Sequence, residues 1–153
     1  MEIFFGVDLP NNVMSALDKC SDDALDDLKL WGKTRHEILN HVNDSCEDML
    51  IYLAHQNGIS VLLMDKTPYT IHMNILAPVG TNTNKVINFL KSFLDEMKEK
   101  TDIHKFEVFS TCPDMHRILL KVGFSIEGVL VDSRRLPTGE FIDEVCYGYL
   151  VDV

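Results

Sequence analysis

Residues 111–149, TCPDMHRILLKVGFSIEGVLVDSRRLPTGEFIDEVCYGY, decide the fold of this chain. They predict a helix in which Pro113 occupies the first turn and Gly123 ends the helix, the usual asymmetry of these two residues. We expect the Thr111 side chain to cap this helix, with Asp114 completing a capping box. Phe124 follows the glycine and should pack back on the helix.

Two strands, 125–132 and 141–150, come next and are joined by the turn-rich sequence SRRLPTGE. They predict a β-hairpin at the C-terminal end. Arg134 and Arg135 lie in the connection, and we expect them to be solvated turn residues. The alternative is that this basic pair contacts an acidic partner.

Strands and helices alternate upstream of this segment, which indicates a mixed α/β sheet. The continuous apolar run 59–64 predicts a central strand covered on both faces. The strictly alternating residues 69–76 predict a second strand, and 104–110 a third. A helix with one clean apolar stripe is predicted over 85–98.

The N-terminal part predicts a short strand at 2–8, a helix at 13–20 and a further helical start at Ser21. A long helix is predicted over 36–57, because its apolar residues recur at a 3.6-residue period. Thr34 and Glu37 form a capping-box pattern at its start, and Gly58 suits its C-terminal end. We expect one domain, 1–153, with a variable part at 1–58 and a sheet core at 59–150.

Composition excludes several classes of function. The formal net charge is −10 over 153 residues, which disfavours non-specific binding to nucleic acid and to anionic lipid. We therefore expect no direct nucleic-acid partner and no membrane association. An early acidic cluster indicates a solvated helix face or a docking patch for a basic partner; its members are Asp18, Asp22, Asp23, Asp26 and Asp27.

The 4 cysteines contain no CxxC or CxxH spacing, so we expect no metal site. The first residues, MEIFFGVDLP, lack the features of a signal peptide, and no apolar run is long enough to span a bilayer. A cytoplasmic location with reduced thiols is expected.

The order of these elements resembles the GNAT superfamily of N-acetyltransferases. HRILLKVGFSIEGVLVD resembles the helix, Gly-Phe and strand of that family, and GEFIDEVCYGYL resembles its last strand. YTIHMNILAP at 69–78 resembles the fourth strand. The resemblance implies a mostly antiparallel central sheet flanked by helices, with a C-terminal β-hairpin. Residues 1–58 match only by type and lack one early strand, so we expect a reduced or degenerate member, loosely similar to GNAT-like proteins of short-tailed phages.

In that family a glycine-rich loop after the fourth strand holds the CoA pyrophosphate through backbone N–H groups at a helix N-terminus. The resemblance places a cofactor-binding loop here at Leu76, Val79, Gly80, Thr81, Asn82, Thr83 and Asn84. Val79 stands where the family has Arg or Gln. Asn82 and Asn84 stand at two glycine positions. Two roles stay open for this loop, helix capping and acetyl-CoA binding.

The family's general acid, a Tyr four residues before the Gly-Phe glycine, corresponds to Leu119, and an Asn that opens the same segment corresponds to Pro113. A base is often drawn from the fourth strand, where His72 and Asn74 share one face. A histidine suits this role, because the unperturbed pKa of imidazole lies near neutral pH. The alternative is that His72 has a structural role only.

Two functions are therefore expected as hypotheses. The lost motifs favour a binding or structural protein with a protein partner, a homo-oligomeric or larger assembly, and a place in a phage virion or host cytoplasm. The alternative is a CoA-dependent N-acyltransferase that acts on an amine, with His72 or a water as base. Acetyl-CoA is the cofactor only in the second case.

Overall fold

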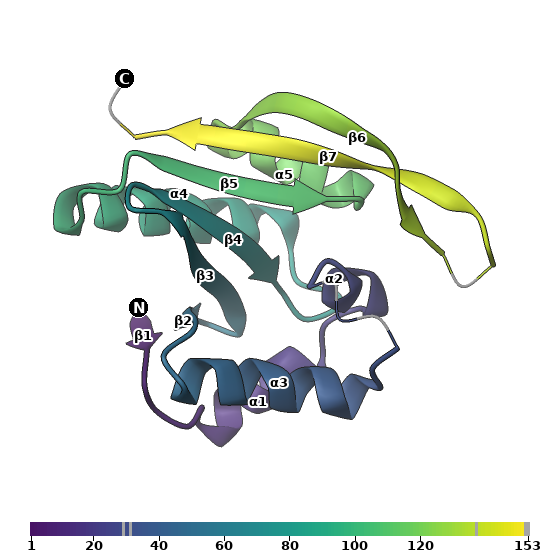
Figure 1. The fold of residues 1–153 in the computed structure, drawn as a ribbon. Helices are drawn as coiled ribbons and strands as arrows, with labels where there is room; N and C mark the ends of the chain where they lie inside the picture. Colours follow the sequence, from purple (N-terminus) through teal and green to yellow (C-terminus); the bar gives the residue numbers. More distant parts are fainter. Residues whose placement is uncertain (29, 31, 137, 152–153) are drawn as a thin grey trace.

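A computed structural model describes residues 1–151 except 29, 31 and 137. Its strands form one sheet in the order β1-β2-β3-β4-β5-β7-β6 (Figure 1). Among these neighbours β4 and β5 are parallel and the other pairs are antiparallel. The strands are β1 (Glu2–Phe4), β2 (Tyr52–Gln56), β3 (Ile59–Thr67), β4 (Thr70–Leu76), β5 (Lys105–Ser110), β6 (Ser125–Arg135) and β7 (Phe141–Leu150).

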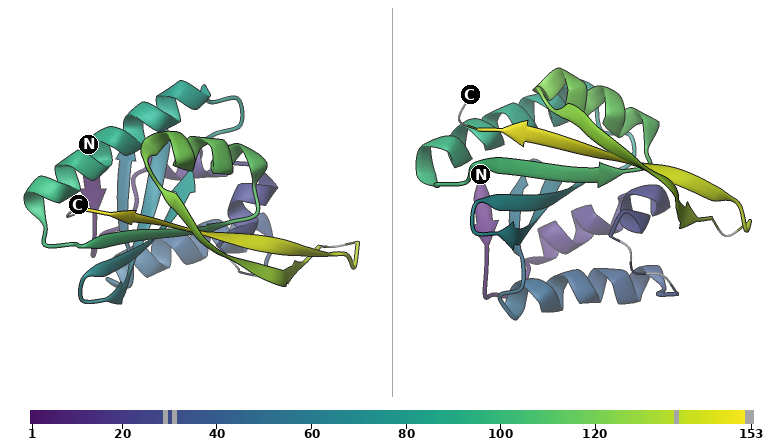
Figure 2. Two further views of the ribbon diagram at one scale, coloured as in Figure 1. Left: turned by 90° about the horizontal axis from the view of Figure 1, so that it is seen from above. Right: turned by 45° about the horizontal axis from the view of Figure 1, so that its top comes forward.

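Helices cover both faces of this sheet (Figure 2). The larger core joins α4 and α5 to the sheet, and the smaller one joins α1, α2 and α3 to its other face. The helices are α1 (Asn11–Asp18), α2 (Asp22–Asp26), α3 (Arg35–Glu47), α4 (Thr83–Lys100) and α5 (Pro113–Val122). The predicted mixed α/β class, with a mostly antiparallel sheet flanked by helices and a C-terminal β-hairpin, is confirmed.

The long helix predicted over 36–57 is wrong, because α3 ends at Glu47 and β2 follows. The capping box of Thr34 and Glu37 is present at its start. At its end Leu50 N–H donates to Ser45 O and Met49 N–H to Cys46 O, the hydrogen-bond pattern of a Schellman motif. Met49 takes the left-handed position with φ +61°, a place that glycine usually fills. The sequence therefore contains no residue type that would mark the end of this helix.

Gly58 does not end a helix; it completes the turn between β2 and β3. Gln56 pairs with Ile59, so Asn57 and Gly58 form a two-residue loop. Both have positive φ, +52° and +85°, as a type I′ turn requires, and Asn-Gly is the preferred pair for it. The early strand expected to be missing is present as β2, and the sheet is not reduced.

The start of α5 also differs from its prediction. Cys112 is the N-cap residue, and no side chain caps the helix there. The Thr111 hydroxyl instead accepts a hydrogen bond from Arg134 Nη1 at 3.3 Å. Pro113 begins the helix as predicted, and Gly123 ends it with φ +120°. Phe124 is buried, and its N–H donates to Leu119 O at 2.9 Å.

The C-terminal hairpin is longer than predicted, because β6 continues to Arg135. Its far end extends beyond the helices and the rest of the sheet (Figure 2). Within β6 the pairing with β7 shifts twice, between Ile126 and Gly128 and between Leu130 and Arg134. Such bulges re-aim side chains, and the second brings Arg134 inward, where it is 3% exposed.

Replacing Gly58 with Ala should cost about 1–2 kcal/mol of unfolding free energy, because an L side chain is strained at φ +85°. Urea denaturation measures the loss. Gly128→Ala is the matched control, because Gly128 lies outside the left-handed region and an added Cβ meets nothing within 4 Å. Equal losses in both variants would contradict the assigned turn.

Candidate functional site

The parallel strands β4 and β5 pair over a short length and then separate. Their register ends at His72 opposite Glu107, whereas β4 continues to Leu76 along β3 and β5 continues to Ser110 along β7. Figure 1 shows β3 and β4 diverging from β5 and β7. We call residues 73–76 of β4 and 108–110 of β5 the β4–β5 fork. Backbone groups of β4 at the fork have no β5 partner, and an unpaired strand edge is the kind of place where extended ligands add to a sheet.

Side chains fill most of this fork. A cavity of about 10 Å³ is left, room for one water molecule at most. Ile75, Val108 and Met115 bound it on the apolar side, and Asp27, Asn74 and Ser110 bound it on the polar side. Asn74 Nδ2 donates to the backbone oxygen of Asp27 at 3.3 Å. The residue after α2 is thus held against the end of β4.

Arg134 is the centre of the polar network at the fork. Its Nη1 donates to Asp27 Oδ1 at 2.7 Å, and its Nη2 donates to Glu144 Oε2 at 2.7 Å. Asp27 Oδ2 also accepts from the Ser110 hydroxyl at 3.1 Å. The network joins α2, the end of β5 and the C-terminal hairpin. The expectation that Arg134 is a solvated turn residue is therefore wrong.

Burial sets the energetics of this network. The side chains of Arg134 and Glu144 are 3% and 1% exposed, so a lost partner would leave a charge without water. Burial raises the pKa of the Asp27 carboxyl, while the bonds from Arg134 and Ser110 oppose that rise. Two carboxylates share one guanidinium, and Arg134 Nε has no hydrogen-bond partner among the described residues.

The loop after β4 differs from a phosphate-binding loop in its hydrogen bonds. The N–H of Val79 donates to Lys19 O at 2.8 Å, and the N–H of Thr81 donates to Pro78 O at 3.1 Å. Asn82 Oδ1 accepts from the N–H of Asn84 at 2.8 Å and so caps α4. Three N–H groups of this loop are used internally, whereas those of Gly80, Asn82 and Thr83 have no partner among the described residues.

Gly80 takes a left-handed backbone conformation in this loop, with φ +86°. Asn82 has φ −62°, so it does not use the left-handed angles of the glycine that it replaces. Val79 is 73% exposed and Leu76 is buried. The predicted cofactor residues therefore lie together at the start of α4, with Leu76 pointing into the core.

The two predicted catalytic residues of β4 lie on the half-buried face of that strand. The His72 ring lies 5.3 Å from the Phe109 ring, between centroids. Asn74 is engaged with Asp27 as described above. The pairing of His72 with Glu107 brings a buried carboxylate to the base of the fork, and Lys66 Nζ donates to both of its oxygens at 2.7 and 3.0 Å.

The position of the family's Tyr holds a fully buried leucine, Leu119. One helical turn earlier, His116 Nδ1 and the Tyr147 hydroxyl lie 2.8 Å apart. Burial raises the pKa of the Tyr147 hydroxyl, with a smaller contribution from Cys112. Tyr147 is 1% exposed, whereas His116 is half-buried, so their contact is only partly shielded from solvent.

Sequence patterns missed Asp27, Glu107, Arg134 and Glu144 as members of one region. A single Glu in the apolar strand 104–110 was the one local signal.

The early acidic cluster is partly neutralised, since Arg35 forms ion pairs with Asp18 and Asp22. No group of three metal-ligating side chains occurs in the described part of the chain, and no described helix could cross a bilayer.

Comparison with solved structures identifies this arrangement of strands and helices. A ribosomal-protein-alanine N-acetyltransferase from Brucella melitensis superposes with TM-score 0.69 at 14% identity, covering 98% of this chain and 99% of that chain. A GNAT-family acetyltransferase from Bacillus anthracis gives 0.69 at 16% identity, covering 99% and 95%. The fold is that of the GNAT acetyltransferases.

An N-acetyltransferase from Staphylococcus aureus Mu50 gives a TM-score of 0.70 at 14% identity, covering 99% of this chain and 98% of that chain. No protein-family model matches the sequence, and comparison with curated proteins finds no similar sequence. Because the identities are low, these comparisons support the GNAT fold and leave its chemistry to the residues of the site.

Replacing Arg134 with Met should cost about 3–5 kcal/mol of unfolding free energy, because Asp27 and Glu144 lose their buried counter-charge. Chemical denaturation measures the loss. Arg135→Met is the matched control, since Arg135 is exposed and its guanidinium carbon lies 6.0 Å from the centroid of the Phe141 ring. That variant should lose less than about 1 kcal/mol. An Arg134→Met loss as small as the control's would contradict the buried network.

Asp27→Asn should change how stability depends on pH. The folded-state pKa of Asp27 is raised above 3.8, so its contribution to stability is fully present below that value and is lost as pH rises through the folded pKa. The unfolding free energy of the wild type should therefore fall relative to Asp27→Asn as the pH rises from below 3.8 through the folded-state pKa of Asp27. A relative gain for the wild type would contradict the assignment.

Proposed function

We propose that this chain uses the GNAT fold for a binding or structural role and does not transfer an acyl group from CoA. The observation that carries the proposal is the filled β4–β5 fork. An acyl-pantetheine chain would have to enter there, and the cavity is about 10 Å³. Its admission would require Asp27 to leave Arg134 and Ser110.

The loop at the start of α4 supports the same proposal. A pyrophosphate needs several converging N–H donors and positive potential. Here the N–H groups of Val79, Thr81 and Asn84 are already bonded within the protein, so only those of Gly80, Asn82 and Thr83 are left among the described residues of the loop. Val79 adds no charge to the loop.

Absence of a suitable acid is the third support. Release of a CoA thiolate is assisted by a proton donor near the sulfur. Leu119 is aliphatic and buried at the position of the family's Tyr. The neighbouring polar pair, His116 and Tyr147, is bonded to itself.

A protein partner or a larger assembly is the setting that we propose for this role, including a place as a phage virion component. The edge strand β6 supports it, because Val129, Leu130 and Val131 are exposed on it. Exposed apolar residues on an unpaired strand edge mark a surface for association.

Isothermal titration with acetyl-CoA tests the proposal. We expect no heat of binding at about 1 mM ligand, and no rise in melting temperature, because a ligand that binds must stabilise the folded state by mass action. Saturable binding in the micromolar range would overturn the proposal. In that event loss of binding in Gly80→Ala, which strains φ +86° while its Cβ meets nothing within 4 Å, would locate the site in the loop.

A CoA-dependent N-acyltransferase is the alternative function, and one observation favours it. His72 and the buried Glu107 are opposite each other at the base of the fork, a suitable place for a base that deprotonates an amine. Glu107→Gln should then abolish acetylation of a polyamine substrate while leaving acetyl-CoA binding intact. No acetylation by the wild type would dismiss this alternative.

A further inference from the structure

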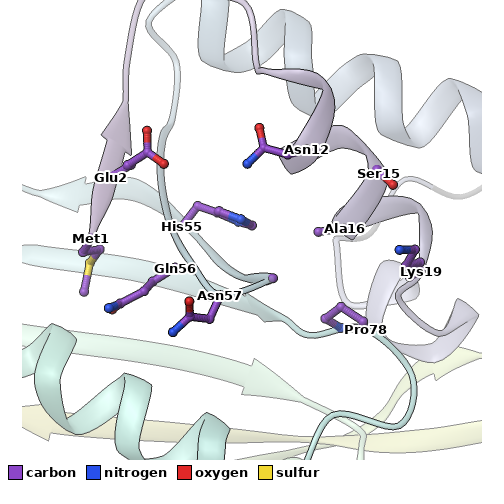
Figure 3. A pocket seen from close by; sticks show the side chains of 11 residues that line it. Met1, Glu2, Asn12, Ser15, Ala16, Lys19, His55, Gln56, Asn57 and Pro78 are labelled. Atoms are coloured by element: carbon purple, nitrogen blue, oxygen red, sulfur yellow. The ribbon is translucent and has the colours of Figure 1, made fainter.

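A polar cavity lies away from the fork. It holds about 600 Å³ between β1, α1 and the β2–β3 turn (Figure 3). None of its lining residues borders the fork cavity. A volume of this size is typical of small-molecule sites, which combine a cavity with a few converging polar groups.

His55 is the buried polar group of this cavity. It is 6% exposed, and its Nδ1 lies 2.9 Å from the hydroxyl of Ser60, a fully buried residue on the paired strand. This contact fixes the ring, and Figure 3 shows the ring directed into the cavity. Its Nε2 has no partner among the described residues. Burial lowers the pKa of His55, so the ring is neutral at pH 7 and presents one hydrogen-bonding nitrogen.

Opposite charges stand on two sides of that ring. Glu2 projects from β1 on one side, and Lys19 lies just after α1 on the other (Figure 3). Neither forms an ion pair with a described residue, unlike Arg35 or Arg134. The amide of Asn12 and the hydroxyl of Ser15, both on α1, also line the cavity.

We propose that this cavity binds a small zwitterion of the short-peptide type. Glu2 takes its ammonium group, Lys19 takes its carboxylate, and His55 Nε2 with Asn12 bonds the amide groups between them. A dianion such as phosphate would face the carboxylate of Glu2 without compensation, and an apolar ligand would leave the polar lining unpaired. The two unpaired charges therefore select a ligand that carries both signs at separate ends.

Titration of the full chain with triglycine, followed by calorimetry and by NMR of the His55 ring nitrogens, tests this site. We expect saturable binding with a shift of the Nε2 resonance. N-acetyl-triglycine lacks the ammonium group and triglycine amide lacks the carboxylate, so each should bind roughly fivefold more weakly, as the loss of one exposed ion pair predicts.

Variants assign each charge to its end of the ligand. Glu2→Gln should abolish the preference for triglycine over its N-acetyl form, and Lys19→Met should abolish the preference over its amide. Lys91→Met, a change on the exposed side of α4, should leave both preferences intact. No saturation by triglycine, or equal affinity for the three peptides, would overturn the proposal. Neither result bears on acetyl-CoA, so the proposed function stands or fails separately.

Discussion

Arg134 holds the C-terminal hairpin against the end of α2 through its ion pairs with Asp27 and Glu144. These groups are separated by up to 107 positions along the chain. A buried ion pair adds little net stability compared with apolar packing, but the loss of one partner is costly. The network therefore acts as a constraint on geometry, because the hairpin, α2 and the end of β5 must stay together for any of the charges to be compensated.

The same constraint decides what the β4–β5 fork can accept. In a sheet with this topology the end of the parallel pairing exposes backbone groups of β4, which is a place for an extended ligand. Here Asn74 and Asp27 hold α2 over that place. The fold is that of acetyltransferases, while the fork is filled by the protein's own side chains, and fold alone does not imply function.

Much of this fold follows from local patterns. The Thr34 side chain caps the start of α3, and the positive φ of Gly123 ends α5. Both helix ends are confirmed. The long helix was predicted wrongly because Leu53 and Ala54 of β2 continue the apolar spacing of α3. The helix ends just before Met49, and a methionine gives no indication that its backbone is left-handed. The Asn57-Gly58 pair is the sequence feature that indicates a β-hairpin at this point.

The candidate site was less predictable than the fold. The loop from Val79 to Asn84 lies where the sequence placed it, because it directly follows a strand and precedes a helix. The contacts of Arg134 could not be predicted, since they depend on a register shift in β6 and on the position of α2. Glu107 was overlooked because one acid in an apolar strand usually faces solvent, and only the pairing with β4 brings it opposite His72.

A crystal structure grown with acetyl-CoA at about 1 mM tests the central claim most directly. The account predicts that Arg134 remains bonded to Asp27 and Glu144, with no electron density for pantetheine between β4 and β5. Density for the cofactor along the free edge of β4, with Asp27 displaced from Arg134, would contradict it.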